Sequence, residues 1–173
     1  DDVRVSDFNL IGEEGGGWAI AMATAGFERG LMLRSPARFQ QASRRLVELY
    51  RQRQNDILDL SIEDSVVRCY MDAEAYALST YQTASRLINN GAIGPESSCN
   101  KIFWSELDLR IHETAMSLLG AKAEIEPSSP DADQQLANWL DGFLFAQSGP
   151  IYAGTNEIQR NIIAERMLGM PRR

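Results

Sequence analysis

The stretch IYAGTNEIQRN, residues 151–161, contains the residue types in this chain that are best suited to chemistry. Gly154 has no side chain, so the backbone there can approach a ligand closely. Thr155 is a favourable N-cap for a following helix, and Glu157 falls in the first turn, where an acid suits the helix dipole. The N–H groups at this helix start could bind an oxyanion or a phosphate. An ordinary capped helix has the same residues, so the spacing alone leaves both interpretations open.

Outside this stretch, no cluster of residues indicates a metal site or a nucleophile. His112 is the only histidine, and without other histidines or a cysteine cluster it predicts no metal centre. A Ser-His-Asp site would need His112, but the sequence has no G-x-S-x-G turn. Cys69 and Cys99 fit no metal spacing and are expected to be buried or half-buried thiols in a reducing compartment, the cytoplasm. We therefore expect His112 to be structural.

The charge of the chain excludes some partners. Seventeen basic and 24 acidic residues give a formal net charge of −7, which argues against a general nucleic-acid binder. One basic cluster contains Arg44, Arg45, Arg51 and Arg53, and we expect it to be a solvated helix face; a phosphate-rich ligand is the alternative. No apolar run reaches transmembrane length, and the first ten residues do not form a signal peptide.

Apolar residues recur at helical spacing along most of the 173 residues. Residues 18 to about 53 can form one long helix, interrupted by Gly26, Gly30 and Pro36. Four further helices are predicted at residues 61–88, 95–120, 133–147 and 155–168, bounded by a capping-box-like Ser61, by glycines and by prolines. The sequence therefore predicts an all-α antiparallel four-helix bundle with a short extra helix. A short strand is expected at Val3 to Val5, and since a lone strand is unstable, the chain is expected to be a domain of something longer.

Two long motifs resemble one enzyme family. IYAGTNEIQRNIIAERMLG resembles the C-terminal signature of the acyl-CoA dehydrogenases. VRVSDFNLIGEEGGGWAIAMATAGFERG resembles the junction where their middle β-domain meets the C-terminal helical domain. The resemblance implies that residues 1–17 are the end of the β-domain and a linker, and that residues 18–173 are the helical domain. It also implies FAD as cofactor, an acyl-CoA substrate and an electron-transfer flavoprotein as electron acceptor.

In that family a carboxylate removes the α-proton of the thioester, and the β-hydrogen leaves as a hydride to the flavin. The commonest family pattern is Tyr-Glu-Gly-Thr, with the glutamate as base; here it is Tyr152-Ala153-Gly154-Thr155. The base is absent, but the backbone N–H of Ala153 can still polarise the thioester carbonyl. Other members place the base on the first helix of this domain, before an arginine, and that position here is Glu28.

The resemblance implies roles for further residues. Thr155 and Glu157 match positions that contact FAD. Arg29 matches a position near the CoA end of the substrate, and Tyr152 and Gly154 line the substrate site.

Two family motifs are not recognisable. For the Arg-x-Thr-Phe-Gly motif that contacts FAD across the dimer, only Arg51 or Arg53 could correspond. LLGAKAEIEPSSPDAD, residues 118–133, stands where the family has a Gly-Gly-rich turn. Such departures resemble members that act on bulky or steroid-like acyl-CoAs.

Three functions follow. The first is the C-terminal domain of an acyl-CoA dehydrogenase with Glu28 as base, inactive as an isolated piece. The second is a non-catalytic subunit or oligomerisation module of a mixed assembly of the same family. The third is a free-standing helical interaction protein. The family packs these domains into homo- or hetero-oligomers, dimers or tetramers, so we expect self-association.

Overall fold

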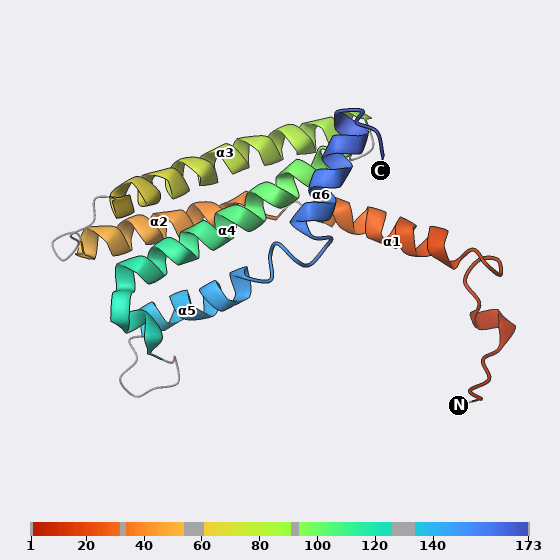
Figure 1. The fold of residues 1–173 in the computed structure, drawn as a ribbon, viewed down its shortest axis with the longest axis horizontal. Helices are drawn as coiled ribbons and strands as arrows, with labels where there is room; N and C mark the ends of the chain where they lie inside the picture. Colours follow the sequence, from red (N-terminus) through yellow and green to blue (C-terminus); the bar gives the residue numbers. More distant parts are fainter. Residues whose placement is uncertain (1, 32–33, 54–60, 91–93, 126–133, 173) are drawn as a thin grey trace.

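The computed structural model describes residues 2–31, 34–53, 61–90, 94–125 and 134–172, and for residues 25–31, 90 and 134–137 it describes the backbone alone. All of the regular secondary structure in the described residues is helical (Figure 1). The α-helices are α1 (Gly17–Leu31), α2 (Pro36–Arg53), α3 (Ser61–Asn90), α4 (Ser97–Leu119), α5 (Gln134–Ala146) and α6 (Asn156–Ile162). Helix α6 continues as a π-helical turn, Ile163–Met167. Short 3-10 helices cover Asp7–Asn9 and Gly120–Glu124.

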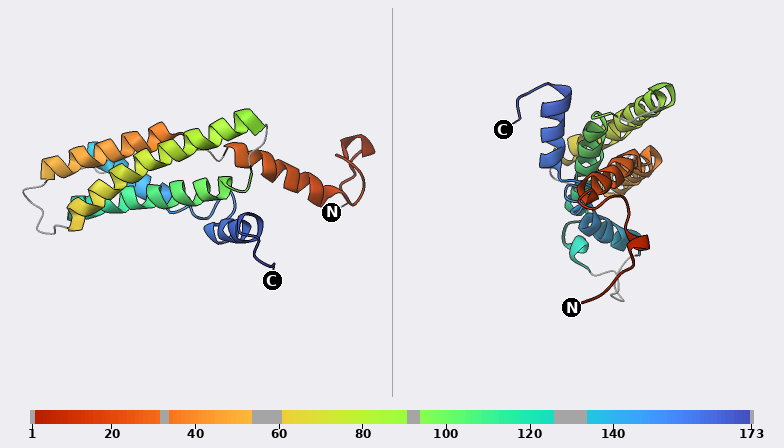
Figure 2. Two further views of the ribbon diagram at one scale, coloured as in Figure 1. Left: turned by 90° about the horizontal axis from the view of Figure 1, so that it is seen from above. Right: turned by 90° about the vertical axis from the view of Figure 1, so that its right-hand side faces the viewer.

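Helix α4 is the centre of the bundle, since it contacts α2, α3, α5 and α6. Helices α2 to α5 run antiparallel in succession, and α6 packs on α4 at the end of the bundle from which α1 projects (Figures 1 and 2). The core consists of apolar side chains from four helices: Phe39, Leu46, Ala73, Tyr76, Trp104, Leu107, Ile111, Ala115 and Trp139. The predicted all-α bundle is confirmed.

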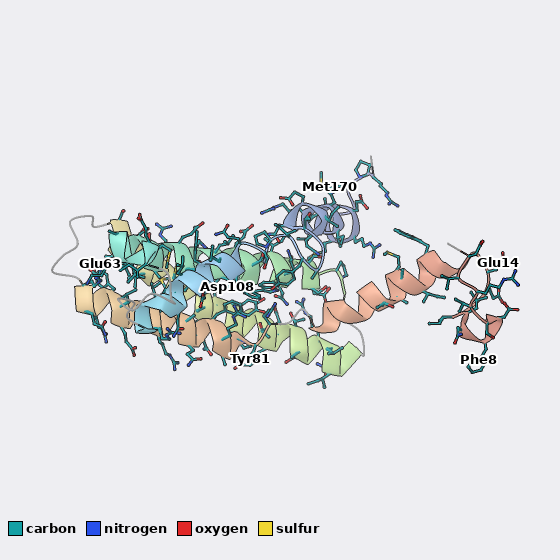
Figure 3. The ribbon with its side chains drawn as sticks, turned by 90° about the horizontal axis from the view of Figure 1, so that it is seen from below. Phe8, Glu14, Glu63, Tyr81, Asp108 and Met170 are labelled. Atoms are coloured by element: carbon teal, nitrogen blue, oxygen red, sulfur yellow. The ribbon has the colours of Figure 1, made fainter. Side chains whose placement is uncertain are left out.

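The N-terminal part of the chain lies away from the bundle. In Figure 3, Phe8 and Glu14 lie beyond the far end of α1. Trp18 on α1 is 77% exposed, and Phe8 is 94% exposed. Apolar side chains that stay exposed in this way form a surface that another domain or chain can cover.

Two details of the predicted fold are wrong. The single helix over residues 18–53 is two helices, because Pro36 lacks an N–H and disfavours helical geometry at the preceding residue. Pro36 instead begins α2, where a missing N–H costs nothing. The strand at Val3 to Val5 is absent, and no strand occurs in the described part of the chain. A strand needs a neighbouring strand for its hydrogen bonds, and these residues have none here.

The other predicted helices are confirmed to within a few residues. Gly120, with φ +55°, ends α4, since glycine adopts this positive φ more easily than other residues. His112 is structural as predicted: it is buried, its Nδ1 lies 2.8 Å from the Asp108 carbonyl oxygen, and its ring packs edge-on against Trp139. Asp108 lies within the bundle, where its Oδ2 accepts a hydrogen bond of 3.0 Å from Arg38 (Figure 3).

The two cysteines differ from each other. Cys69 is buried as expected, and its pKa is raised because burial disfavours the thiolate. The prediction that Cys99 is at least half-buried is wrong: Cys99 is exposed, although Ser97, Ser98 and Asn100 in the same turn of α4 are buried, because its side chain lies on the side of the turn that no neighbouring helix covers. Its sulfur lies 3.8 Å from that of Met167. Within the described residues no group of His, Cys, Asp and Glu could hold a metal ion. No helix in that part of the chain is long and apolar enough to span a membrane.

Candidate active site

The terminal loop, residues 147–155, joins α5 to α6 and packs against α4. Its turns are closed by hydrogen bonds from Tyr152 N to Ser148 O (3.1 Å) and from Asn156 N to Pro150 O (2.9 Å). Gly149 is in contact with α4, where an added Cβ would lie 3.4 Å from the Cβ of Ser105. The loop is therefore held between α6 and the core helix.

Two successive loop residues have left-handed backbone conformations. Ala153 has φ +57° and Gly154 has φ +82°. Such a conformation costs a non-glycine residue about 1–2 kcal/mol, so the surrounding contacts must stabilise it. Gln159 supplies one of them, since its buried Nε2 donates to both Ala153 O (3.1 Å) and Gly154 O (3.2 Å). The N–H of Ala153 donates to no acceptor within the described part of the chain, which leaves it available to a ligand.

Tyr152 is held by an arginine that the sequence analysis did not single out. Arg34, between α1 and α2, donates a hydrogen bond from Nη2 to the Tyr152 hydroxyl. The Arg34 guanidinium carbon lies 5.5 Å from the Tyr152 ring centroid and 5.1 Å from that of Trp104. The two rings are 5.7 Å apart. We call Arg34, Trp104 and Tyr152 the Arg34 stack.

A buried polar network attaches the start of α6 to α4. The side-chain oxygen of Asn156 accepts from Lys101 Nζ (2.7 Å) and from Ser105 Oγ (3.1 Å). All three residues are buried, and Lys101 is completely so. Burial lowers the pKa of Lys101 because it disfavours the ammonium form, while Glu157 and Glu106 act in the opposite direction. The network fixes α6, and hence the loop before it.

The predicted helix cap is confirmed. The Thr155 hydroxyl accepts from Ile158 N at 3.3 Å. Glu157 is exposed in the first turn of α6, and its pKa is lowered mainly by its own backbone N–H and then by the Thr155 hydroxyl. Thr155 therefore ends the loop, and Glu157 lies in the first turn of the helix that follows it.

The structure brings Tyr152, Ala153, Gly154, Thr155 and Glu157 together. Residues 28 and 29 lie in the second half of α1, which ends three residues before Arg34. The side chains of Glu28 and Arg29 are outside the described residues, so their predicted roles stay predictions.

The arginine cluster is only partly the solvated face that we expected. Arg45 lies 5.0 Å from the Trp139 ring centroid, and Arg53 donates to the Leu118 and Leu119 carbonyls (3.0 and 3.2 Å) at the end of α4. Arg51 is exposed, has no polar partner among the described residues, and lines a hollow of about 560 Å³ between α2 and α3. Of the two candidates for the FAD-contacting arginine, Arg53 is bonded to the end of α4, whereas Arg51 has no partner among the described residues.

Sequence reasoning missed Arg34, Trp104, Lys101 and Gln159. Gln159 lies in the quoted C-terminal motif, but its spacing gives no sign that it turns back to residues 153 and 154. A lysine and a tryptophan three apart on one apolar helix were the available signal for the α4 side of the site. Arg34 has no sequence signal, because its contacts lie 70 and 118 residues away.

The comparisons with known proteins place these features in a family. Residues 15–168 match the sequence model of the family described as "Acyl-CoA dehydrogenase, C-terminal domain". The chain therefore belongs to the acyl-CoA dehydrogenase family, as its fold and terminal motif predicted.

Relatives cover nearly the whole chain. The acyl-CoA dehydrogenase IpdE1 of Mycobacterium tuberculosis is 34% identical over 182 residues, which cover 99% of this chain and 43% of the relative. The acyl-CoA dehydrogenase FadE26 of the same organism is 31% identical and is covered over 44% of its length. The chain thus spans less than half the length of these curated relatives.

Solved structures show the same fold. The Tcur3481-Tcur3483 steroid ACAD superposes with a TM-score of 0.82 and 25% identity, covering 100% of this chain and 44% of that one. The ChsE4-ChsE5 complex from Mycobacterium tuberculosis gives a TM-score of 0.75 and 28% identity, covering 99% and 45%.

Proposed function

We propose that this chain is the C-terminal helical domain of an FAD-dependent acyl-CoA dehydrogenase that forms an α,β double bond in an acyl-CoA thioester. The observation that carries the proposal is the geometry of the terminal loop in a member of this family. Gln159 of α6 holds the carbonyls of Ala153 and Gly154 in place by hydrogen bonds. The N–H of Ala153 has no acceptor among the described residues. A fixed backbone donor of this kind stabilises charge that develops on a carbonyl oxygen.

The reaction requires two hydrogens to leave adjacent carbons. Glu28 takes the α-proton, and the Ala153 N–H donates to the thioester oxygen, on which negative charge develops. When bound, FAD supplies the acceptor for the β-hydrogen and its electron pair. Because Ala153 has a methyl side chain, the proton acceptor must come from another part of the chain, and Glu28 on α1 is the position that the family resemblance implies.

Neighbouring residues orient the substrate and the cofactor. A side chain at Gly154 is disfavoured, since φ is +82° and an added Cβ would lie 2.8 Å from Gln159 Nε2, and glycine therefore keeps the backbone there open to the substrate. Tyr152 lines the site, and Arg29 contacts the CoA end. The polar groups present fit an FAD: the Thr155 hydroxyl and the Glu157 carboxylate at the start of α6, and the Arg51 guanidinium, which has no partner among the described residues and is a suitable donor to a pyrophosphate. Arg51 would act across a dimer.

The proposed substrate is a bulky acyl-CoA. One solved relative is titled a steroid ACAD, and the family's usual Gly-Gly-rich turn is missing here. An electron-transfer flavoprotein in the cytoplasm is the proposed electron acceptor.

A non-catalytic subunit of a mixed assembly is the second candidate. The missing carboxylate at Ala153 favours it, and one structural neighbour is titled as a complex of two proteins. Helix α3 also exposes a row of apolar residues that another chain could cover: Val67, Met71, Leu78, Tyr81 and Ile88.

Product analysis with the intact protein tests the proposal. The protein is incubated with a panel of acyl-CoAs and an artificial electron acceptor, and thioester masses are measured. Wild type and Glu113→Gln, a control at an exposed glutamate of α4, are expected to form a product lighter by two hydrogen atoms. Glu28→Gln is expected to form almost none. If wild type converts no acyl-CoA, the non-catalytic subunit is the better account.

A further inference from the structure

The Arg34 stack connects the two segments that the proposed reaction must bring together. Tyr152 directly precedes Ala153, whose N–H is the proposed oxyanion donor. Arg34 follows α1, the helix on which Glu28 lies, by three residues. Its hydrogen bond to the Tyr152 hydroxyl therefore joins the end of the base-bearing helix to the donor-bearing loop.

Arg34 is itself fixed to the bundle through its backbone. The Tyr76 hydroxyl on α3 donates to the Arg34 carbonyl oxygen at 2.8 Å. Tyr76 is completely buried, and burial raises its pKa to about 12, so the hydroxyl keeps the proton that it donates. The position from which the Arg34 side chain starts is thus set by the core.

The surroundings of Arg34 do not resemble those of an arginine kept only for stability. Among the side chains that the structure describes, no carboxylate forms an ion pair with its guanidinium. The charge is instead held by two aromatic faces and a phenol. Partly burying a cation without a carboxylate partner costs solvation free energy, so a role in stability alone does not account for Arg34.

The loop is held from its other side as well. Gln159 binds the carbonyls of Ala153 and Gly154, while the Arg34 stack holds the residue before them. A peptide group fixed on both sides has a defined N–H direction. Since Ala153 is left-handed at φ +57°, the peptide would relax if either restraint were removed.

We propose that Arg34 is a positioning residue for the dehydrogenation, which sets the Ala153 N–H relative to the base on α1. The inference rests on the proposed function, because it concerns the same site. Arg34 acts through Tyr152 and does not itself contact the reacting atoms. Its loss is therefore expected to slow the chemical step more than it weakens substrate binding.

The first experiment measures anaerobic flavin reduction by an acyl-CoA in the intact flavoprotein. The variants are Arg34→Lys, which keeps the charge but loses the planar fork, Tyr152→Phe, which loses only the hydroxyl, and the double variant. Each single variant is expected to reduce the limiting rate about 10- to 100-fold, with the half-saturating concentration changed less than about threefold. The double variant should be no slower than the slower single variant, because both remove one contact.

The control is Arg68→Lys. Arg68 is an exposed arginine that pairs with Asp64 at 2.7 Å on α3. The Arg68→Lys variant is expected to match wild type in limiting rate and in half-saturating concentration. If Arg34→Lys binds too little flavin to assay, Tyr152→Phe still tests the contact, because its ring and packing are retained.

A spectroscopic readout separates positioning from simple stability. An acyl-CoA analogue with sulfur at the β position can lose its α-proton but cannot donate a hydride, so its enolate accumulates beside the oxidised flavin. The long-wavelength charge-transfer absorbance gives the pH at which the bound analogue is half-deprotonated. Arg34→Lys is expected to raise this midpoint by about one unit, a tenfold weaker stabilisation of the enolate.

The possible results lead to different conclusions. A raised midpoint together with a slowed rate supports the inference. A midpoint and rate equal to wild type in Arg34→Lys and Tyr152→Phe overturn it, while the proposed function stands. If wild type shows neither flavin reduction nor enolate absorbance with any acyl-CoA, the proposed function fails and the inference falls with it.

Discussion

The contact between Asn156 and Lys101 gives the sharpest stability prediction. In Asn156→Ala, the completely buried Lys101 loses the acceptor that lies 2.7 Å from its ammonium group, and Ser105 loses one at 3.1 Å. A hydrogen bond to a charged group contributes about 1.5–3 kcal/mol, and a neutral one about 0.5–1.5 kcal/mol. We therefore expect the free energy of unfolding to fall by about 2–4 kcal/mol.

Urea unfolding of residues 1–173, followed by tryptophan fluorescence, measures this loss. Trp104 on α4 is close to Lys101, which lies 5.9 Å from the centroid of its ring, so it reports on the same region. The matched control is Asn161→Ala, since Asn161 is an exposed asparagine on the same helix as Asn156, and its replacement is expected to change stability by less than about 0.5 kcal/mol. A loss below about 1 kcal/mol in Asn156→Ala would refute the conclusion that this network holds α6 on α4.

Three further predictions concern the same region. The pKa of Lys101 is lower in the folded than in the unfolded chain, so the unfolded chain binds more protons near this pKa. The contribution of Lys101 to stability therefore rises with pH up to the ordinary lysine pKa of 10.5. Unfolding at several alkaline pH values should show this rise in wild type and not in Lys101→Met, and an unchanged slope would contradict it. Gly154→Ala should cost about 1–3 kcal/mol, since φ is +82° and the new Cβ would lie 2.8 Å from Gln159 Nε2; melting at the wild-type temperature would contradict this. Adding Ala153→Glu to Glu28→Gln should restore part of the flavin-reduction rate, because a carboxylate then returns to the loop, and the absence of any gain would count against equivalent base positions.

The sequence predicted those elements whose signals are local. The apolar period of three or four residues sets α3, α4 and α5, and Thr155 marks the start of α6, since the cap bonds a residue three positions away. The break before Pro36 was recognised as an interruption, but the sequence could not show that it separates two helices.

The rest depends on contacts between distant residues. Arg34 meets Tyr152 across 118 residues, and Lys101 meets Asn156 across 55. No local pattern encodes such pairs, because they form only when the helices pack. The exposure of Cys99 was missed for the same reason, since helical periodicity does not show which face a neighbouring helix covers.

The most direct test of the central claim is single-turnover flavin reduction by the intact protein. Wild type and Glu28→Gln are mixed anaerobically with the best acyl-CoA of the panel, and flavin absorbance is followed in time. The account predicts that wild type loses its oxidised-flavin absorbance and that Glu28→Gln does so about 100- to 10,000-fold more slowly, the usual contribution of a general base. Equal rates in the two proteins would contradict it, and would show that the α-proton goes to a group other than Glu28.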